Sequence, residues 1–218
     1  MIRLLSVSSR GFRPATFSAI INFIVTDLPP NTTHPKTREK WRDWLGRHHS
    51  RDEGVWLISY KKATGKPRFS YDEAVEEAVC FGWIDSLPRK LDEERSMLYF
   101  APRKAGSNWS RLNKERVEKM LDAEKMMPTG LAKVEAAKED GSWNALDGVE
   151  NLEIPTDLAE AFANYPHSAE NFDAFPRSAK RGILEWIFNA KRPQTRAKRI
   201  GETASLAAQN IRANQWPK

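Results

Sequence analysis

Residues 80–110, CFGWIDSLPRKLDEERSMLYFAPRKAGSNWS, gather side chains that are well suited to bind a charged ligand. Arginine offers paired hydrogen bonds to a carboxylate or phosphate, and tryptophan offers a flat apolar wall. The free backbone amides at the beginning of a helix also favour an anion. We therefore expect a small anionic ligand at this corner of the chain, with the candidate residues Trp83, Asp85, Arg103, Lys104, Trp109, Ser110 and Asn113.

Each candidate has an expected role in that site. Arg103 and Lys104 would neutralise the ligand, and Trp83 or Trp109 would stack on it. Ser110 would donate a hydrogen bond from the helix start.

A purely structural interpretation of the same stretch stays open. In it, Asp85 and Asp92 form ion pairs with Arg89, Arg103 and Arg116, which fix a corner between a strand and a helix.

Two further functions are alternatives to this non-catalytic binding protein. An enzyme would use Asp85 as a general base, which requires burial to raise the pKa of Asp85, whereas nearby cations lower it. A nucleic-acid-binding protein would use the basic residues 191–199, which include Lys191, Arg192 and Arg196. No standard nucleotide-binding, hydrolase or zinc-protease motif is present in the sequence.

The charge of the chain is unevenly placed. The 218 residues carry a formal net charge of +6. Residues 139–173 contain nine acids and no lysine or arginine, and residues 177–199 contain eight basic residues and one acid. The two segments either face each other across the fold or leave a basic groove for nucleic acid, and the acidic segment argues against the groove.

Neither a metal nor a cofactor is expected. Of the four histidines, His48 and His49 are adjacent, so on a helix they point about 100° apart and do not share one metal simply. Cys80, the one cysteine, ends an apolar helix face and is interpreted as a buried packing residue.

Residues 1–30 are expected to be a disordered or targeting leader. They are rich in arginine and serine and contain no acid before Asp27, which is typical of a mitochondrial presequence. The remaining chain lacks an apolar stretch long enough to span a membrane. We expect an intracellular, cytoplasmic protein, or a mitochondrial matrix protein if the leader is a presequence. A periplasmic location is not favoured, because the leader lacks a cleavage site.

The elements that must position the corner follow from periodicity and capping signals. Thr37 begins a helix, residues 55–60 form a strand, and Ser70 with Glu73 forms a capping box for a helix that stops at Gly82. A second strand, MLYFAP, is followed by a helix from about Ser107 and by further helices starting near Thr129, Thr156, Ser168, Ser178 and Thr195.

These elements predict an α+β fold, with a small N-terminal antiparallel sheet, packed helices and a helical C-terminal half. We expect one domain over residues 31–218, whose helical part covers about 142–214. Trp41, Trp44, Trp56 and Val75 are expected to share its core.

The blocks FSYDEAVEEAVCFGWIDS, FAPRKAGSNWSRLN, PTGLAKVEAAKEDGSW and AKRPQTRAKRI resemble the YdeI/OmpD-associated (OmdA, bacteriocin-protection) family, from about Lys40 to Ile211. The resemblance implies an α+β protein without an assigned catalytic activity and with a role in protection against bacteriocins or antimicrobial peptides. Gln194 and the segment Ser86-Leu87-Pro88 depart from the family pattern. The block 190–200 adds Lys191, Arg192 and Arg196 to the candidate ligand-binding residues.

Overall fold

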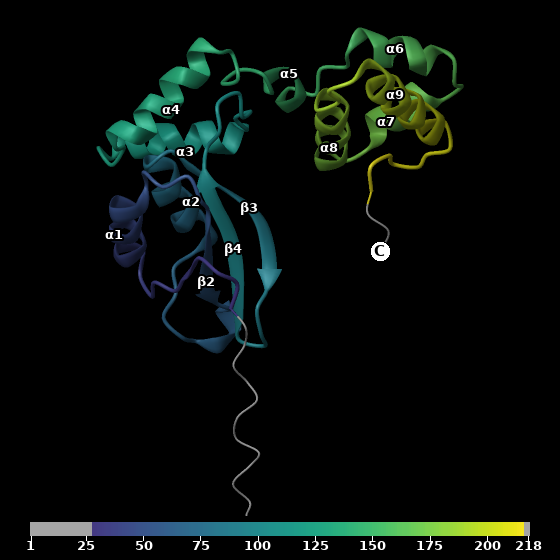
Figure 1. Ribbon diagram of the computed structural model, residues 1–218. Coiled ribbons are helices and arrows are strands. Elements are labelled where there is room, and N and C mark those ends of the chain that lie inside the picture. Colours follow the sequence, from purple (N-terminus) through teal and green to yellow (C-terminus); the bar gives the residue numbers. More distant parts are fainter. Residues whose placement is uncertain (1–27, 216–218) are drawn as a thin grey trace, which may run out of the picture.

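The computed structural model describes residues 28–215, and these residues form an α+β fold, as predicted (Figure 1). The predicted leader lies almost entirely outside the described residues. The N-terminal part contains β1 Thr32–Thr33, α1 Arg38–His48, β2 Val55–Tyr60, the 3-10 turn η1 Lys62–Thr64, α2 Tyr71–Cys80, β3 Trp83–Lys90, β4 Arg95–Pro102, α3 Arg111–Asp122 and α4 Pro128–Glu139. The C-terminal part contains α5 Asp147–Glu150, α6 Thr156–Ala163, α7 Ser168–Ala174, α8 Arg177–Phe188 and α9 Pro193–Ala208.

The sheet has four strands in the order β1-β2-β4-β3. Strands β2, β4 and β3 are antiparallel, as expected, but the short β1 pairs in parallel with β2, so the sheet is mixed. Strand β3 was not among the predicted strands, and it contains Pro88 and three charged residues. Proline is tolerated here because β3 lies at the edge of the sheet, and the pairing is irregular between Asp85 and Pro88.

Local capping explains where the N-terminal helices begin. The Thr37 side chain accepts a hydrogen bond from the Lys40 amide, and Ser70 forms the predicted capping box with Glu73. The last helix differs from the prediction. Pro193 occupies its first turn, because a proline there lacks only an N–H group that has no partner inside the helix.

A first hydrophobic core lies between the sheet and the N-terminal helices. Trp41 of α1 and Val75 of α2 are buried in it, and Trp44 packs against it, as predicted. Trp56 is a correction, because side chains alternate along β2 and place Val55 and Leu57 in this core instead.

Trp56 is only partly buried and packs on other partners. Its ring lies 5.1 Å from the ring of Tyr99, and the guanidinium of Arg89 lies 5.1 Å from its centre. Trp56 therefore stabilises pairing between strands more than the core.

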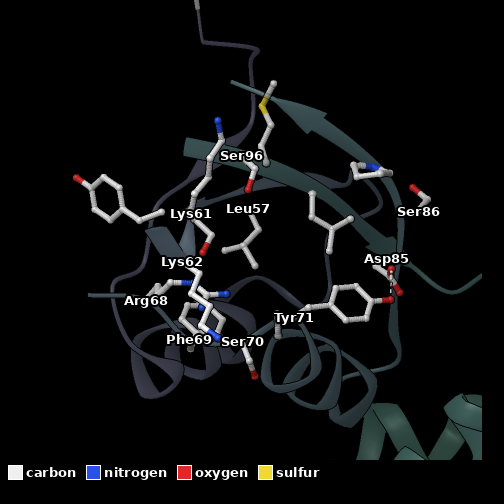
Figure 2. A pocket seen from close by; sticks show the side chains of 16 residues that line it. Leu57, Lys61, Lys62, Arg68, Phe69, Ser70, Tyr71, Asp85, Ser86 and Ser96 are labelled. Atoms are coloured by element: carbon white, nitrogen blue, oxygen red, sulfur yellow. Dashed lines mark hydrogen bonds between the residues drawn. The ribbon is translucent and has the colours of Figure 1, made fainter. Parts of the chain in front are cut away.

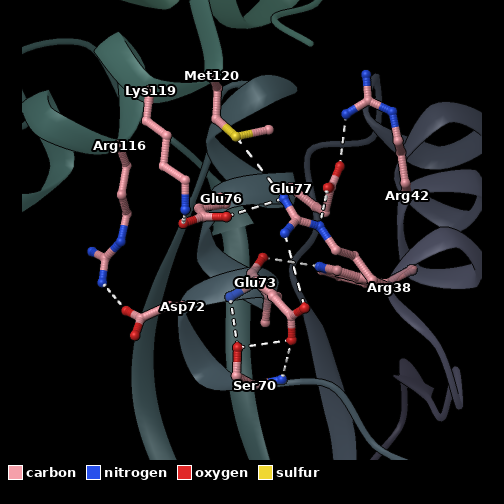
Figure 3. A network of polar contacts seen from close by, with 12 residues as sticks. Arg38, Arg42, Ser70, Asp72, Glu73, Glu76, Glu77, Arg116, Lys119 and Met120 are labelled. Carbon is pink, nitrogen blue, oxygen red and sulfur yellow. Dashed lines mark hydrogen bonds and ion pairs between the residues drawn. The ribbon is translucent and has the colours of Figure 1, made fainter. Parts of the chain in front are cut away.

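A network of ion pairs joins α1, α2 and α3 beside this core (Figure 3). Glu77 is almost fully buried and accepts hydrogen bonds from Arg38 and Arg42, each at 2.6 Å. Glu76, also buried, pairs with Arg38 at 3.0 Å and with Lys119 at 2.5 Å. Two helical carboxylates therefore connect cations from both neighbouring helices.

The C-terminal helices form a second hydrophobic core, grouped beyond α5 in Figure 1. The acidic and basic segments of the sequence face each other within this part of the chain. Their ion pairs are Glu150–Arg181, Asp157–Arg196 and Lys180–Asp173. The interpretation that the two segments face each other is thus confirmed, while the single domain stays a prediction.

Across residues 28–215, no helix combines the length and apolar character that crossing a bilayer requires.

Candidate functional site

The predicted corner is centred on a buried arginine stacked on a tryptophan. Arg103 is 3% exposed and Trp109 is 1% exposed. The guanidinium carbon of Arg103 lies 3.6 Å from the centre of the Trp109 ring, and Nη1 donates to the carbonyl oxygen of Asn108 at 2.9 Å. Burial lowers the pKa of Arg103 to about 10, although the charge of Asp85 opposes this shift. The stack lines a small cavity of about 50 Å³.

Trp83, Ser110 and Asn113 have structural roles at this corner. The indole of Trp83 is buried, lies edge-on to Trp44 and donates to the carbonyl oxygen of His49 at 3.2 Å, so no face is open for a ligand. The Ser110 hydroxyl caps α3 by accepting from the amide of Asn113.

The structure does not contain the ion pairs that the structural interpretation of this corner expected for Asp85 and Asp92. Asp92 pairs with Arg95 at 2.6 Å, and Arg116 pairs with Asp72 at 2.7 Å. Asp85 accepts from a tyrosine. The structural interpretation therefore named the wrong ion pairs, although the corner itself is largely internal.

The C-terminal candidates lie at the beginning of α9. Arg196 is paired with Asp157 at 2.6 Å, whereas Lys191 and Arg192 are exposed. One hydrogen bond, from Asn108 to Asn189 at 3.3 Å, connects the corner with the α8–α9 connection. Of the basic candidates in this block, only Lys191 and Arg192 are open to a partner.

Asp85 lines a second, larger and open pocket (Figure 2). This pocket has a volume of about 590 Å³, which is within the range of about 300–1,000 Å³ usual for small-molecule sites. It lies between the sheet and the segment that leads from β2 into α2. Its lining residues are Leu57, Ser59, Tyr60, Lys61, Lys62, Arg68, Phe69, Ser70, Tyr71, Ala74, Asp85, Ser86, Pro88, Ser96, Met97 and Leu98.

Side chains of β2 and β4 form the floor of the pocket, and the floor changes from apolar to polar along the strands. Leu57 of β2 lies directly opposite Leu98 of β4, and two residues further along, Ser59 lies opposite Ser96. Because side chains two residues apart share a face, an apolar pair is followed by a hydroxyl pair. Phe69, which is buried, extends the apolar part.

Opposite charges lie on different sides of the pocket. Lys62 and Arg68 are exposed near Phe69, whereas Tyr71 and Asp85 form the other side (Figure 2). Among residues 28–215, the side chains of Lys62 and Arg68 form no ion pair and no hydrogen bond. Two cations are therefore available at one end of a partly apolar pocket.

The Tyr71–Asp85 pair is a fixed hydrogen bond. The Tyr71 hydroxyl donates to Asp85 Oδ2 at 2.9 Å. Burial, together with the hydrogen bond to Asp85, raises the pKa of Tyr71 to about 12. Tyr71 therefore stays protonated at neutral pH and acts as a donor, not as a base.

Of the residues that define this pocket, only Asp85 was predicted from the sequence as a candidate. Lys62, Arg68 and Tyr71 surround the capping box in the stretch KKATGKPRFSYDE. A basic loop leading into a helix start was the available signal, but the sequence does not show that the loop folds over the sheet.

This geometry defines an α+β protein with a preformed pocket on its sheet. Two family models match the chain. Residues 33–133, which include the whole pocket, match a model described as Domain of unknown function (DUF8412). Residues 151–210, which contain α6–α9, match the family described as Bacteriocin-protection, YdeI or OmpD-Associated, so the predicted resemblance is confirmed on these helices. No curated protein and no solved structure matches the chain.

Proposed function

We propose that the protein is a non-catalytic, bacteriocin-protection-type binding protein that holds a small organic anion in the pocket between Lys62, Arg68, Tyr71 and Asp85. The observation that carries the proposal is that Lys62 and Arg68, which lie beside an apolar floor, have no side-chain partner among residues 28–215. The family match of α6–α9 supports the protective role.

The distribution of charge defines the ligand. An anionic group would lie at Lys62 and Arg68, where an arginine provides paired donors and a lysine provides a point charge. An apolar body would cover Leu57 and Leu98. A hydrogen-bond donor on the opposite end would face Asp85, because a carboxylate repels a second anion and accepts hydrogen bonds.

Binding is favoured over catalysis by the state of the Tyr71–Asp85 pair. An acid–base reaction needs a group whose pKa lies near the working pH. The pKa of Tyr71 is raised to about 12, and Asp85 is already engaged as the acceptor of its hydroxyl. An enzyme that uses Asp85 as a base stays an alternative. If that alternative holds, mass spectrometry would detect a reaction product after the protein is incubated with the probe.

Nucleic-acid binding through residues 191–199 also stays an alternative, but some of the positive charges in this segment already have partners within the protein. Arg196 is paired with Asp157, and Arg199 lies over the Trp186 ring at 4.9 Å and donates to the carbonyl oxygen of Trp186. Lys191, Arg192 and Lys198 are exposed. A steep loss of affinity with salt would identify this function.

The test compares naphthoate with naphthamide, a probe of the same shape without the charge. We expect naphthoate to bind the wild type at least about tenfold more tightly, since a charge-assisted contact is worth about 1.5–3 kcal/mol. The double variant Lys62→Gln/Arg68→Gln should lose this preference. The matched control Lys191→Gln/Arg192→Gln removes the same charge from another exposed site and should retain it.

Two results would overturn the proposal. One is equal affinity of the wild type for the acid and the amide. The other is an equal loss in both double variants, which would mean that net charge, and not the pocket, attracts the probe.

A further inference from the structure

The small cavity at the predicted corner lies beside a buried positive charge that forms no ion pair within residues 28–215, although the more distant charge of Asp85 acts on it. Arg103 is 3% exposed, and in the described part of the chain it forms no ion pair. Its Nη1 donates to the backbone oxygens of Asn108 and Ser107, at 2.9 and 3.4 Å. These carbonyl oxygens satisfy N–H groups, but they carry no full charge to balance the guanidinium.

Two residues that line the same cavity carry hydrogen-bond donors without a partner among residues 28–215. In the described part of the chain, the buried Nε of Arg103 and the buried Nε1 of Trp109 have no hydrogen-bond partner. Both residues belong to the lining of the cavity of about 50 Å³. A buried donor without an acceptor costs about 1–3 kcal/mol, and more when it is charged.

The rim of the cavity adds further charge. Lys104 and Lys133 are exposed at this rim, and so is Asp140. Asp140 is turned toward neighbouring backbone, because it accepts from the amides of Gly106 and Ser142, at 3.1 and 2.8 Å. With Arg103, the three cations outnumber the one carboxylate.

We propose that this cavity is a second site, separate from the organic-anion pocket, and that it binds one compact inorganic anion against Arg103 and Trp109. The anion accepts from the two donors without partners and neutralises the buried guanidinium. The size of the cavity excludes a large organic anion. Lys104, predicted from the sequence as a ligand-binding residue, guides the anion at the rim.

The first experiment is a thermal melt of the full chain in sodium chloride, sulfate or phosphate, with sodium gluconate at equal ionic strength as the control. Gluconate is too large for the cavity and corrects for general screening of charge. An anion that binds only the folded state should raise the Tm by about 3–5 °C for each tenfold increase in its concentration above its Kd.

The variant Arg103→Met separates an anion site from a structural clamp. Methionine matches the length of the buried part of arginine but carries no charge. If Arg103 needs an anion, the variant should melt at or above the wild-type temperature in gluconate, since replacing an uncompensated buried charge by an apolar group is neutral or stabilising. Its dependence on chloride, sulfate and phosphate should disappear.

A second variant keeps the test decisive if Arg103→Met does not fold. Trp109→Phe removes the indole N–H but keeps an aromatic face for Arg103, so it should weaken the anion-dependent shift without abolishing it. Lys133→Met, at the rim, should leave most of the shift in place.

The proposal is overturned if no compact anion shifts the wild-type Tm relative to gluconate, which would mean that only water occupies the cavity. It is equally overturned if Arg103→Met loses the same stability in every salt, because Arg103 would then act as a structural clamp through its carbonyl contacts. Neither result would affect the binding of naphthoate in the open pocket.

Discussion

Replacing Glu77 by glutamine tests the ion-pair network that joins α1 to α2. Glu77 is 1% exposed, and its carboxylate lies 2.6 Å from both Arg38 Nε and Arg42 Nη1. Glutamine has nearly the same shape, so the change removes the charge without creating a cavity. Both arginines would then lose a buried partner.

The expected loss of unfolding free energy depends on the interactions that Arg38 and Arg42 keep in the Glu77→Gln variant. Breaking a buried pair typically costs about 3–5 kcal/mol. The side chains of Arg38 and Arg42 are 22% and 29% exposed, so water replaces part of the lost interaction. Arg38 also keeps Glu76 at 3.0 Å. We therefore expect a loss of about 2–4 kcal/mol, which corresponds to a Tm lower by about 4–16 °C.

Chemical denaturation of Glu77→Gln and Glu94→Gln provides the assay. Glu94 pairs with Lys66 at 2.6 Å on the exposed surface, and its loss should leave the unfolding free energy unchanged within error. If both variants unfold at the wild-type denaturant concentration, burial does not make the Glu77 pairs stabilising, and the reasoning is refuted.

Three further predictions concern packing and pH. Trp41→Ala should lower the unfolding free energy by about 3–5 kcal/mol, whereas Trp56→Ala should lower it by only about 1–2 kcal/mol. Equal losses in chemical denaturation would mean that Trp56 belongs to the core. Gly130→Ala should destabilise the protein by about 1–3 kcal/mol, because the added Cβ would lie 2.2 Å from the carbonyl oxygen of Cys80, the last residue of α2. Alanine usually stabilises a helix relative to glycine. A higher Tm for the variant would therefore show that this contact is looser. The hydrogen bond from Arg181 holds the pKa of Glu150 below its ordinary value of 4.5, so the stabilisation is complete above that value and is lost as the pH falls through the lowered pKa. The Tm difference between the wild type and Glu150→Gln should therefore shrink between neutral pH and about pH 3, and a constant difference would exclude this linkage.

Local signals in the sequence predicted the helices well. Thr37 and Ser70 cap helices in the structure as predicted, because a cap depends only on the few residues that follow it, whereas the helix predicted from about Ser107 is capped by Ser110 and begins at Arg111. Strand β3 was missed because Pro88 and the neighbouring charges are unfavourable in a central strand, and only pairing with β4 shows that β3 is an edge.

The candidate site was predicted less completely than the fold. The sequence correctly brought Arg103 and Trp109 together, because a strand end and a helix start are close along the chain. It did not show that Trp83 turns into the core, or that Asp85 is hydrogen-bonded to Tyr71 at the side of a different pocket. Side-chain direction along β3 depends on its register with β4, which no local pattern specifies.

The central claim is that the pocket over Leu57 and Leu98 holds the apolar part of an anionic ligand. Methyl NMR of the full chain during a naphthoate titration tests this most directly. The account predicts saturable shifts at Leu57 and Leu98 that are absent in Lys62→Gln/Arg68→Gln, with Leu158 and Leu184 of the second core unchanged. Shifts confined to the second core, or no saturable shift at Leu57 and Leu98, would contradict it.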